Sequence, residues 1–397
     1  MNSINLENTY TSLPQEFFRY TEAEAMPDVN VVTINEQLAD LLNIDIGFLK
    51  SQSGLRFLSG KNSKTLPNSI SLAYAGHQFG HLVPQLGDGR AVLLGDKICQ
   101  DGVRRDIQLK GSGKTYFSRG GDGRAGIGPV IREYLISESM HHLGVPTTRS
   151  LAVLLTGEKV VRAEVSPGAM LVRVAKSHVR VGTFEFFAIR NQKDHIRKLA
   201  DFMIERSHPD LSDKKEKYEL FFERIVKGQA SLVAQWNSVG FIHGVMNTDN
   251  TSISCETIDY GPCAFMDSYE ANKVFSSIDQ YGRYAFSNQS RVAPWNLSRL
   301  AETILFLISE NTSDAIKVVE EILFDFDKNF NNSLDILSSR KLGFKNNSKK
   351  TSSLYFELLN LMEAGKADFT GTFKSLKATL IKEDDTIFLY NFRNSVE

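Results

Sequence analysis

The feature that most constrains the fold is a change of residue pattern near Thr183. Before this point, glycines separate short apolar runs of the kind that form β-strands. These runs cover residues 91–94, 106–110, 150–155 and 170–175. Between the second and third run, residues 129–143 space their apolar side chains as an amphipathic helix does. The N-terminal half is therefore predicted to be a sheet with one inserted helix.

Beyond Thr183, apolar residues recur with helical spacing over residues 193–206, 217–239 and 296–309, the last beginning after Pro294. Short helical patterns also cover residues 354–361 and 373–380, whereas the Lys-, Asn- and Ser-rich residues 338–353 favour an exposed loop. We therefore predict an α+β chain with a sheet-rich N-terminal lobe and a mainly helical C-terminal lobe.

Three segments are predicted as domains. Residues 1–60, with helical periodicity at 34–49, are expected to form an N-terminal cap. Residues 61–182 form the sheet-rich lobe and residues 183–397 the helical lobe.

The composition of the chain excludes several classes of binding partner. The chain has 397 residues, 42% of them hydrophobic, which suffices for a large core. A formal net charge of −1 favours neither nucleic acid nor an anionic membrane as a partner. Three cysteines without zinc-like spacing suit a reducing compartment, and no leader or membrane-length apolar run is visible. We expect a cytoplasmic protein, a monomer, with no nucleic acid and no membrane as partners.

One motif carries the chemistry. His243 and Asn250 keep the spacing of a kinase catalytic loop, and Asp259 begins an Asp-x-Gly turn nine residues later. In that arrangement the Asn and the Asp hold metal against phosphate oxygens. The position of the kinase catalytic Asp is Val245, however, and the nearest carboxylate is Asp249. The motif predicts a site that binds metal and triphosphate but has its base displaced.

Further residues suit a triphosphate. Lys110 ends a predicted strand and Glu133 follows 23 residues later on the predicted helix, the order of a kinase lysine and its glutamate partner. Arg173 and Arg180 offer guanidinium forks for phosphate oxygens. Glycines that allow close approach are dense between positions 87 and 128.

Each element also has an ordinary explanation. Lys110 and Glu133 could form a surface ion pair, and Arg173 could face outward from its strand. Asp259 could belong to a plain turn and Asp249 could cap one. Gly111-Ser-Gly-Lys-Thr115 is not a phosphate-binding loop of the P-loop type, because position 108 is Gln108 instead of glycine.

The motifs together resemble one family. The sequence closely resembles the selenoprotein O family over about residues 70–300, in the order that family shows. The motifs are Tyr74-Ala-Gly-His-Gln-Phe-Gly-His81, Gln85-Leu-Gly-Asp-Gly-Arg90, Gln108-Leu-Lys-Gly-Ser-Gly113, Gly121-Asp-Gly-Arg124, His243-Gly-Val-Met-Asn-Thr-Asp-Asn250 and Tyr284-Ala-Phe-Ser-Asn-Gln289. The resemblance implies a protein-kinase-like pseudokinase fold whose members transfer AMP from ATP to Ser, Thr or Tyr hydroxyls of proteins, with ATP bound in reverse.

The resemblance also implies a role for each matching position. Asp249 corresponds to the proton acceptor, and Asn250 and Asp259 to ligands of Mg²⁺, with Mn²⁺ as a second possibility. The matching nucleotide-binding positions are Gly87, Gly89, Arg90, Lys110, Asp122, Gly123, Glu133, Arg173, Arg180 and Asp259.

The expected reaction follows from these roles. Metal on Asn250 and Asp259 would polarise the α-phosphate, the lysine and the two arginines would stabilise pyrophosphate, and Asp249 would deprotonate the acceptor hydroxyl. Family members usually continue further and many end in a Cys-x-x-Sec or Cys-x-x-Cys pair, whereas this chain ends at Glu397, so redox control through that pair is not expected. Two alternatives stay open: a conventional kinase that transfers the γ-phosphate, and a catalytically inactive ATP-binding scaffold.

Overall fold

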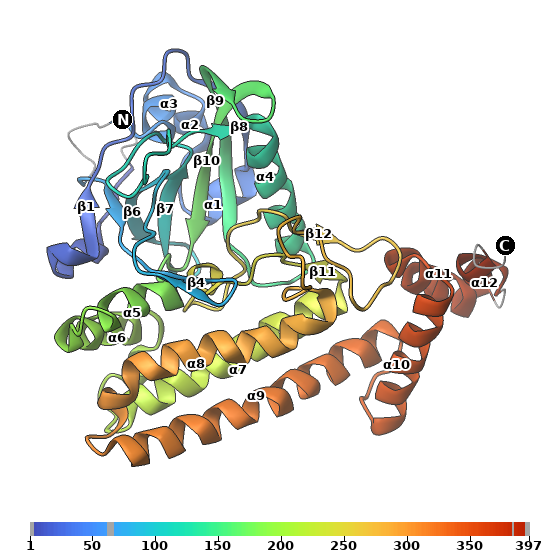
Figure 1. Cartoon of the computed structure of the whole chain (residues 1–397). Helices are drawn as coiled ribbons and strands as arrows, with labels where there is room; N and C mark the ends of the chain where they lie inside the picture. Colours follow the sequence, from blue (N-terminus) through green and yellow to red (C-terminus); the bar gives the residue numbers. More distant parts are fainter. Residues whose placement is uncertain (1–3, 62–66, 383–384, 394–397) are drawn as a thin grey trace. The chain divides into compact units, whose positions relative to one another are not determined.

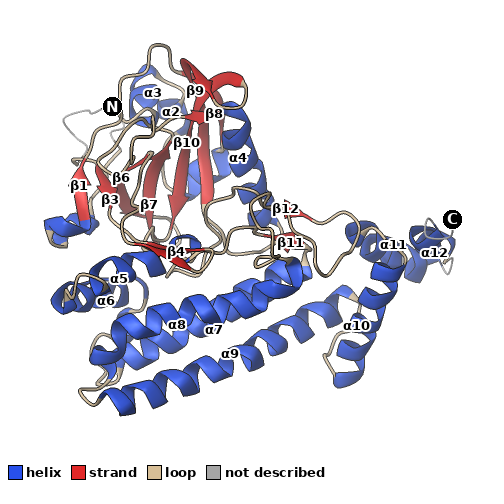
Figure 2. Cartoon of the chain, in the orientation of Figure 1, coloured by secondary structure: helices blue, strands red, loops and turns tan. Residues whose placement is uncertain are grey.

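The computed structural model describes residues 4–61, 67–382 and 385–393. Its N-terminal region is rich in sheet and its C-terminal region is helical, which confirms the predicted α+β class (Figures 1 and 2). The chain forms two compact units. The first unit comprises Met1–Phe221, Asn247–Tyr260 and Glu302–Glu310, and the second comprises Phe222–Met246, Gly261–Ala301 and Asn311–Glu397.

The first unit is built on one antiparallel sheet with the strand order β1-β3-β6-β7-β10-β9-β2, and β8 pairs with β10. The strands are β1 (Phe18–Tyr20), β2 (Asn30–Ile34), β3 (Ile70–Leu72), β6 (Ala91–Ile98), β7 (Arg104–Lys110), β8 (Ala125–Gly126), β9 (Arg149–Val161) and β10 (Val165–Ala175). All four predicted runs lie inside β6, β7, β9 and β10. The first sixty residues supply β1 and β2 to the same sheet.

The two faces of the sheet bury alternate residues of β9 and β10, as strand geometry requires. Val153 and Leu171 pack with Val130 of α4 (Ile127–His142), the helix predicted at 129–143. Leu154 and Val172 point to the other face and join a core with helices α1 (Glu36–Leu41), α2 (Ile46–Leu49) and α3 (Gln52–Leu58). The face that α4 covers also carries the side chains of Lys110 and Arg173.

The helical periodicity expected at residues 34–49 is only partly realised. β2 ends at Ile34, and the helical part is split into α1 and α2. Asn43 lies between them with a φ of +50°, a left-handed conformation that interrupts a helix and that Asn adopts more readily than most residues.

The remaining elements of the first unit surround a short hairpin. Strands β4 (Gly76–Gln78) and β5 (His81–Val83) form a separate two-stranded sheet. Helix α5 (Val181–Ala188) contacts β4, the 3₁₀ turn η4 (Thr248–Asn250) and helix α6 (Lys193–Ser207). The turn η4 thus joins the first unit although it is distant in sequence from the sheet.

The second unit is mainly helical. It contains most of α7 (Lys217–Ser238) and α8 (Gln289–Ile308), together with α9 (Thr312–Lys341), α10 (Lys349–Ala364), α11 (Phe369–Lys382) and α12 (Thr386–Arg393). A two-stranded ladder joins β11 (Phe241–Ile242) to β12 (Ala264–Phe265). Aromatic residues of this unit, including Phe286, Tyr355 and Phe369, form its core. No helix in the described ranges has the length and apolarity that crossing a bilayer requires.

Two predicted boundaries in this unit were wrong. Helix α8 begins at Gln289, ahead of Pro294, which lies inside the helix. The expected loop at 338–353 is shorter, because α9 continues to Lys341 and α10 begins at Lys349. Its polar residues have structural partners: Ser348 caps α10, and the Ser339 and Thr351 hydroxyls are 2.8 Å apart in a buried pair.

Candidate functional site

The strand pattern places the predicted lysine and arginine on one face. Lys110 pairs with Leu171 across β7 and β10, and Arg173 lies two residues further along β10. Because residues two apart share a face, Arg173 points to the side that α4 covers. There Glu133 of α4 accepts from Nζ of Lys110 at 2.7 Å and from Nη1 of Arg173 at 3.3 Å. Arg173 is 2% exposed, so the alternative of an ordinary outward-facing strand residue does not hold.

Asp259 joins these cations. Its Oδ1 accepts from Lys110 at 2.7 Å and from Arg173 at 2.6 Å, and its Oδ2 accepts from Arg180 at 2.5 Å. The residue has a φ of +64°, a left-handed conformation that Asp tolerates better than most side chains. Three cationic side chains therefore meet at one carboxylate.

The charges in this cluster decide the ionisation of Asp259. Burial alone would raise its pKa, but Lys110, Arg180 and Arg173 outweigh that effect and hold the pKa well below the usual range. The carboxylate is therefore ionised at any physiological pH. Three cationic groups touch two carboxylates, Asp259 and Glu133, which leaves one positive charge uncompensated within this set. Such an excess suits an anionic ligand.

The turn that carries Asp249 and Asn250 is attached to the same cluster. Nη1 of Arg180 donates to the backbone carbonyl of Asp249 at 2.6 Å. The Asn250 amide donates to the carbonyl of Asn247 at 2.9 Å, and the Asn250 side chain is half-buried. Arg180 therefore links the turn directly to Asp259.

The Asp249 carboxylate lies against strand β4. The side-chain amide Nε2 of Gln78 donates to Oδ2 of Asp249 at 3.4 Å, whereas Oδ1 is buried without a hydrogen-bond partner. A β-carbon on Gly76 would lie 2.5 Å from that Oδ1. Burial raises the pKa of Asp249 to about 6, against the opposing charge of Arg180. A carboxyl group with a raised pKa and an unpartnered oxygen has the chemistry of a general base.

The Gly87–Arg90 turn has a structural reason for its glycines. Gly87 has a φ of +77° and a β-carbon there would meet the Phe117 ring at 2.3 Å, while one at Gly89 would lie 2.9 Å from the Phe117 carbonyl. The Arg90 side chain is exposed, and its carbonyl accepts from the Gly111 amide at 2.7 Å. These three residues shape the loop after β5 and, within the described ranges, form no hydrogen bond or ion pair with Lys110, Arg173, Arg180 or Asp259.

The predicted pair Asp122 and Gly123 lies on a neighbouring loop. Gly123 has a φ of +67°, and a β-carbon there would lie 2.0 Å from the carbonyl of Gly113, so two loops meet at this glycine. The Asp122 carboxylate forms an exposed ion pair with Arg162 at 2.7 Å. The structure therefore brings together Lys110, Glu133, Arg173, Arg180, Asp249 and Asp259, but directs the Asp122 side chain to the surface.

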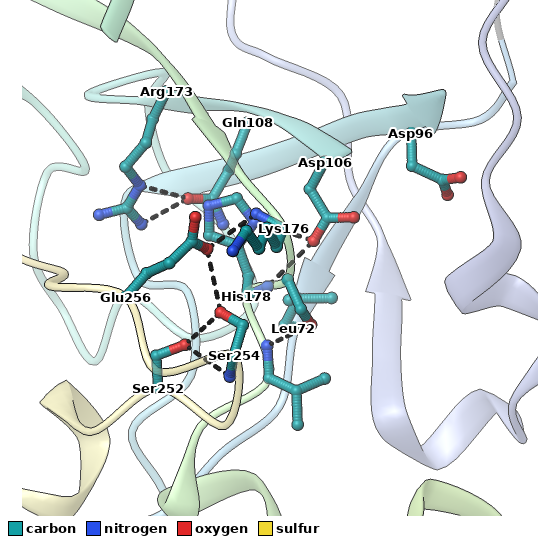
Figure 3. Close-up of polar contacts among 12 residues, drawn as sticks. Leu72, Asp96, Asp106, Gln108, Arg173, Lys176, His178, Ser252, Ser254 and Glu256 are labelled. Atoms are coloured by element: carbon teal, nitrogen blue, oxygen red, sulfur yellow. Dashed lines mark hydrogen bonds and ion pairs between the residues drawn. The ribbon is translucent and has the colours of Figure 1, made fainter. Parts of the chain in front are cut away.

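Sequence reasoning missed three residues that support the arginines. Gln108 accepts from Nε and Nη2 of Arg173 at 3.2 and 2.5 Å, as Figure 3 shows, and donates to buried Asp88 at 3.0 Å. The guanidinium of Arg180 lies 4.6 Å from the centre of the Tyr74 ring. All three belong to motifs that carry the resemblance, but their partners are distant in sequence, so only the fold reveals these contacts.

Behind Arg173 lies a second group of buried polar residues. Glu256 accepts from the Lys176 amide at 2.9 Å and from the Ser254 hydroxyl at 3.0 Å (Figure 3). Burial raises the pKa of Glu256 to about 7, although the charge of Lys176 opposes this. Burial also lowers the pKa of His178, which contacts Asp106 at 3.0 Å, to about 4. Through Glu256, the loop that leads to Asp259 is bonded to the residue that follows β10, Lys176.

The donor chemistry near Asp259 suits a hard cation. Within the described ranges, no group of three or more His, Cys, Asp or Glu side chains is arranged to hold a metal. An Asn and an ionised Asp are nevertheless the oxygen donors that Mg²⁺ takes when phosphate oxygens and water complete its octahedron. Asn250 and Asp259 are therefore of the donor types that such a metal takes.

Comparisons with known proteins agree with this chemistry. A family model described as protein adenylyltransferase SelO matches residues 1–394. A protein nucleotidyltransferase YdiU from Bradyrhizobium diazoefficiens is 51% identical over 370 residues, which are 93% of this chain and 75% of the relative. A protein of the same name from Brevibacillus brevis is 48% identical over 383 residues, or 96% of this chain and 77% of the relative.

Proposed function

Since the chain belongs to the protein adenylyltransferase SelO family, we propose that it transfers AMP from ATP to Ser, Thr or Tyr hydroxyls of proteins. Relatives from several bacteria carry the name protein nucleotidyltransferase, in keeping with this reaction. The observation that carries the proposal is the convergence of Lys110, Arg173 and Arg180 on Asp259 beside the Asp249 turn.

In the proposed reaction, the acceptor oxygen forms a bond to the α-phosphorus while the bond from this phosphorus to the α,β-bridging oxygen breaks. Pyrophosphate leaves with the electron pair, and Asp249 takes the hydroxyl proton. Lys110, Arg173 and Arg180 bind the phosphate oxygens and offset the charge that develops on the leaving group. Glu133 and Gln108 hold the lysine and Arg173 in place while they do so.

Asn250 and Asp259 would hold the metal, which we propose to be Mg²⁺. A metal bound there supplies charge neutralisation at the phosphates. For Asp259 to bind the metal, one of its oxygens must first be released from its cationic partners. Asp259 shares both of its oxygens with three cations, so binding a triphosphate, which attracts the same cations, would free carboxylate oxygen for metal. Nucleotide and metal are then expected to bind cooperatively.

We further propose that the fold is related to that of protein kinases. The supporting features are the strand-borne Lys110 paired with Glu133 of α4, and Asp259 at the start of an Asp-x-Gly turn. The nucleotide-binding lobe predicted for residues 61–182 would work together with the loop Asn247–Tyr260, which belongs to the same unit. The helical lobe predicted for residues 183–397 would correspond to the mainly helical lobe of a kinase-like fold.

Position-specific labels of ATP test the reaction. The purified chain is incubated with MgCl₂, casein as a generic acceptor, and ATP labelled on either the α- or the γ-phosphate. Label from the α-position on protein, with release of pyrophosphate, is expected. Retention of γ-label on casein would mean that the chain is a conventional kinase. ATP-dependent thermal stabilisation without label on any protein would mean a binding scaffold.

A further inference from the structure

The β4–β5 hairpin lacks the support that a larger sheet would give. It pairs with no other strand of the described chain, and an isolated two-stranded hairpin is at best marginally stable in water. Its position must therefore be set by contacts outside the ladder. Those contacts determine where β4 lies relative to Asp249.

One edge of this segment is fastened at every second residue. The Ala75 amide donates to the carbonyl of Gly182 at 2.8 Å, the His77 amide donates to Oγ1 of Thr248 at 2.6 Å, and the Phe79 amide donates to Oδ1 of Asn247 at 3.1 Å. Alternate amides of an extended chain point to the same edge. That edge therefore faces α5 and the Asp249 turn.

The central fastening is a closed arrangement of three residues, which we call the Thr248 clamp: His77, Glu185 and Thr248. The Thr248 hydroxyl accepts from the His77 amide and donates to Oε2 of Glu185 at 2.6 Å. The other carboxylate oxygen of Glu185 contacts Nδ1 of His77 at 2.5 Å. Thr248 is fully buried and Glu185 is 3% exposed, so water competes little for these bonds.

The clamp sits directly beside the proposed base. Thr248 precedes Asp249 in the chain, and His77 lies between Gly76 and Gln78, the two residues that contact the Asp249 carboxylate. The clamp therefore joins β4 to the turn that carries the base.

We infer that Thr248 and Glu185 are positioning residues for AMP transfer. They hold β4 on the Asp249 turn, so that the carboxylate is presented to the acceptor hydroxyl in one orientation. This inference rests on the proposed function. Because misplacement of a reacting group by about 1 Å can cost about 10²-fold in rate, loss of the clamp should lower kcat while leaving ATP binding intact.

The test is a set of variants at Thr248, assayed with α-labelled ATP, MgCl₂ and casein. Thr248→Val keeps the shape and removes the hydroxyl, and kcat is expected to fall by about 10²-fold with the KM for ATP within about threefold of the wild type. Thr248→Ser restores the hydroxyl and should recover kcat to within about threefold. A purely structural role would not produce this split between kcat and KM.

A second variant and a matched control keep the test decisive. Glu185→Gln should lower kcat in the same way, and the double variant Thr248→Val/Glu185→Gln should lose little more than either single variant, because both break one clamp. Thr372→Val is the control, since Thr372 is equally buried and its hydroxyl bonds only to the Asp368 carbonyl in the second unit. Its kcat should stay at the wild-type value.

The outcomes separate the two proposals. If wild-type protein transfers α-label and Thr248→Val retains kcat within about threefold, or changes only KM, the positioning role is overturned while the proposed function stands. Should Thr248→Val be too unstable to assay, a Glu185→Gln variant that keeps kcat within about threefold of the wild type would overturn it equally. If the wild type transfers no α-label, the proposed function fails and this inference fails with it.

Discussion

A β-carbon on Gly76 would lie 2.5 Å from Oδ1 of Asp249 and 2.8 Å from its Cβ. Ordinary van der Waals contact between such atoms requires about 3.4 Å or more. The proposed base therefore occupies space that exists only because position 76 lacks a side chain. Strand β4 and the Asp249 turn pack closely against each other at this point.

This contact makes Gly76→Ala an informative variant. The added methyl group should push the Asp249 carboxylate aside and lower the rate of AMP transfer by about 10²-fold. The affinity for ATP, measured by isothermal titration, should change by less than about threefold, because Lys110, Arg173 and Arg180 are not displaced. Gly128→Ala is the control, since a β-carbon at Gly128 would meet no atom within 4 Å. Equal activity of the two variants would contradict the role of Asp249.

Asp259→Ala tests the charge balance of the cluster. Without this carboxylate, Lys110, Arg173 and Arg180 each lose a short ion pair. Glu133 is then the one carboxylate left in the set to face three cations. Removing one member of a buried ion pair typically costs about 3 kcal/mol. Urea unfolding at pH 7 should show a loss of stability of that size, and AMP transfer should be abolished. An unchanged unfolding midpoint would argue against the cluster.

Tyr74 should matter to ATP binding through Arg180. Its ring lies 4.6 Å from the guanidinium, and a cation–π contact of this kind contributes about 1 kcal/mol. Tyr74→Ala is therefore expected to weaken ATP binding by about fivefold, because Arg180 loses a surface that orients it. Tyr74→Phe keeps the ring and should bind ATP like the wild type. Equal affinities of the two variants would show that the contact has no such role.

Glu256 predicts a pH dependence of stability. Its folded-state pKa of about 7 exceeds the ordinary value of 4.5, so the folded chain holds this proton where the unfolded chain has released it. Unfolding then releases a proton between about pH 4.5 and 7, and the stability contributed by the protonated group is lost as pH rises through this window. Above pH 7 the ionised, buried carboxylate destabilises the fold.

Glu256→Gln mimics the protonated carboxyl group and should remove this loss. Relative to wild type, the variant is expected to be more stable by about 1–3 kcal/mol at pH 8 and to show no such gain at pH 4.5. Urea unfolding at the two pH values measures the difference. Glu357→Gln, at an exposed position of α10, should show no comparable pH dependence. A gain of equal size at both pH values would contradict a raised pKa at Glu256.

Several features could be predicted because their signals are local in sequence. Apolar runs between glycines predicted β6, β7, β9 and β10, and the 3.6-residue period predicted α4 and α7. The spacing of Asn250 and Asp259, and the order of Lys110 before Glu133, singled out residues that the structure joins in one cluster or on its adjacent turn. At residues 338–353, polar composition predicted a longer loop than the structure has. The polar residues there cap α10 through Ser348 and form a buried hydroxyl pair between α9 and α10, so they are compatible with helices.

The amino-acid sequence alone determined the class of fold and the chemical types gathered at the site, because periodicity, glycine placement and motif spacing act over short stretches of chain. The tertiary structure decided which groups meet. The register of β7 and β10 turned Arg173 inward toward Glu133, and the fold brought Gly76 onto Asp249 across 173 residues of sequence. Contacts of this kind depend on packing between distant segments, which no local pattern encodes.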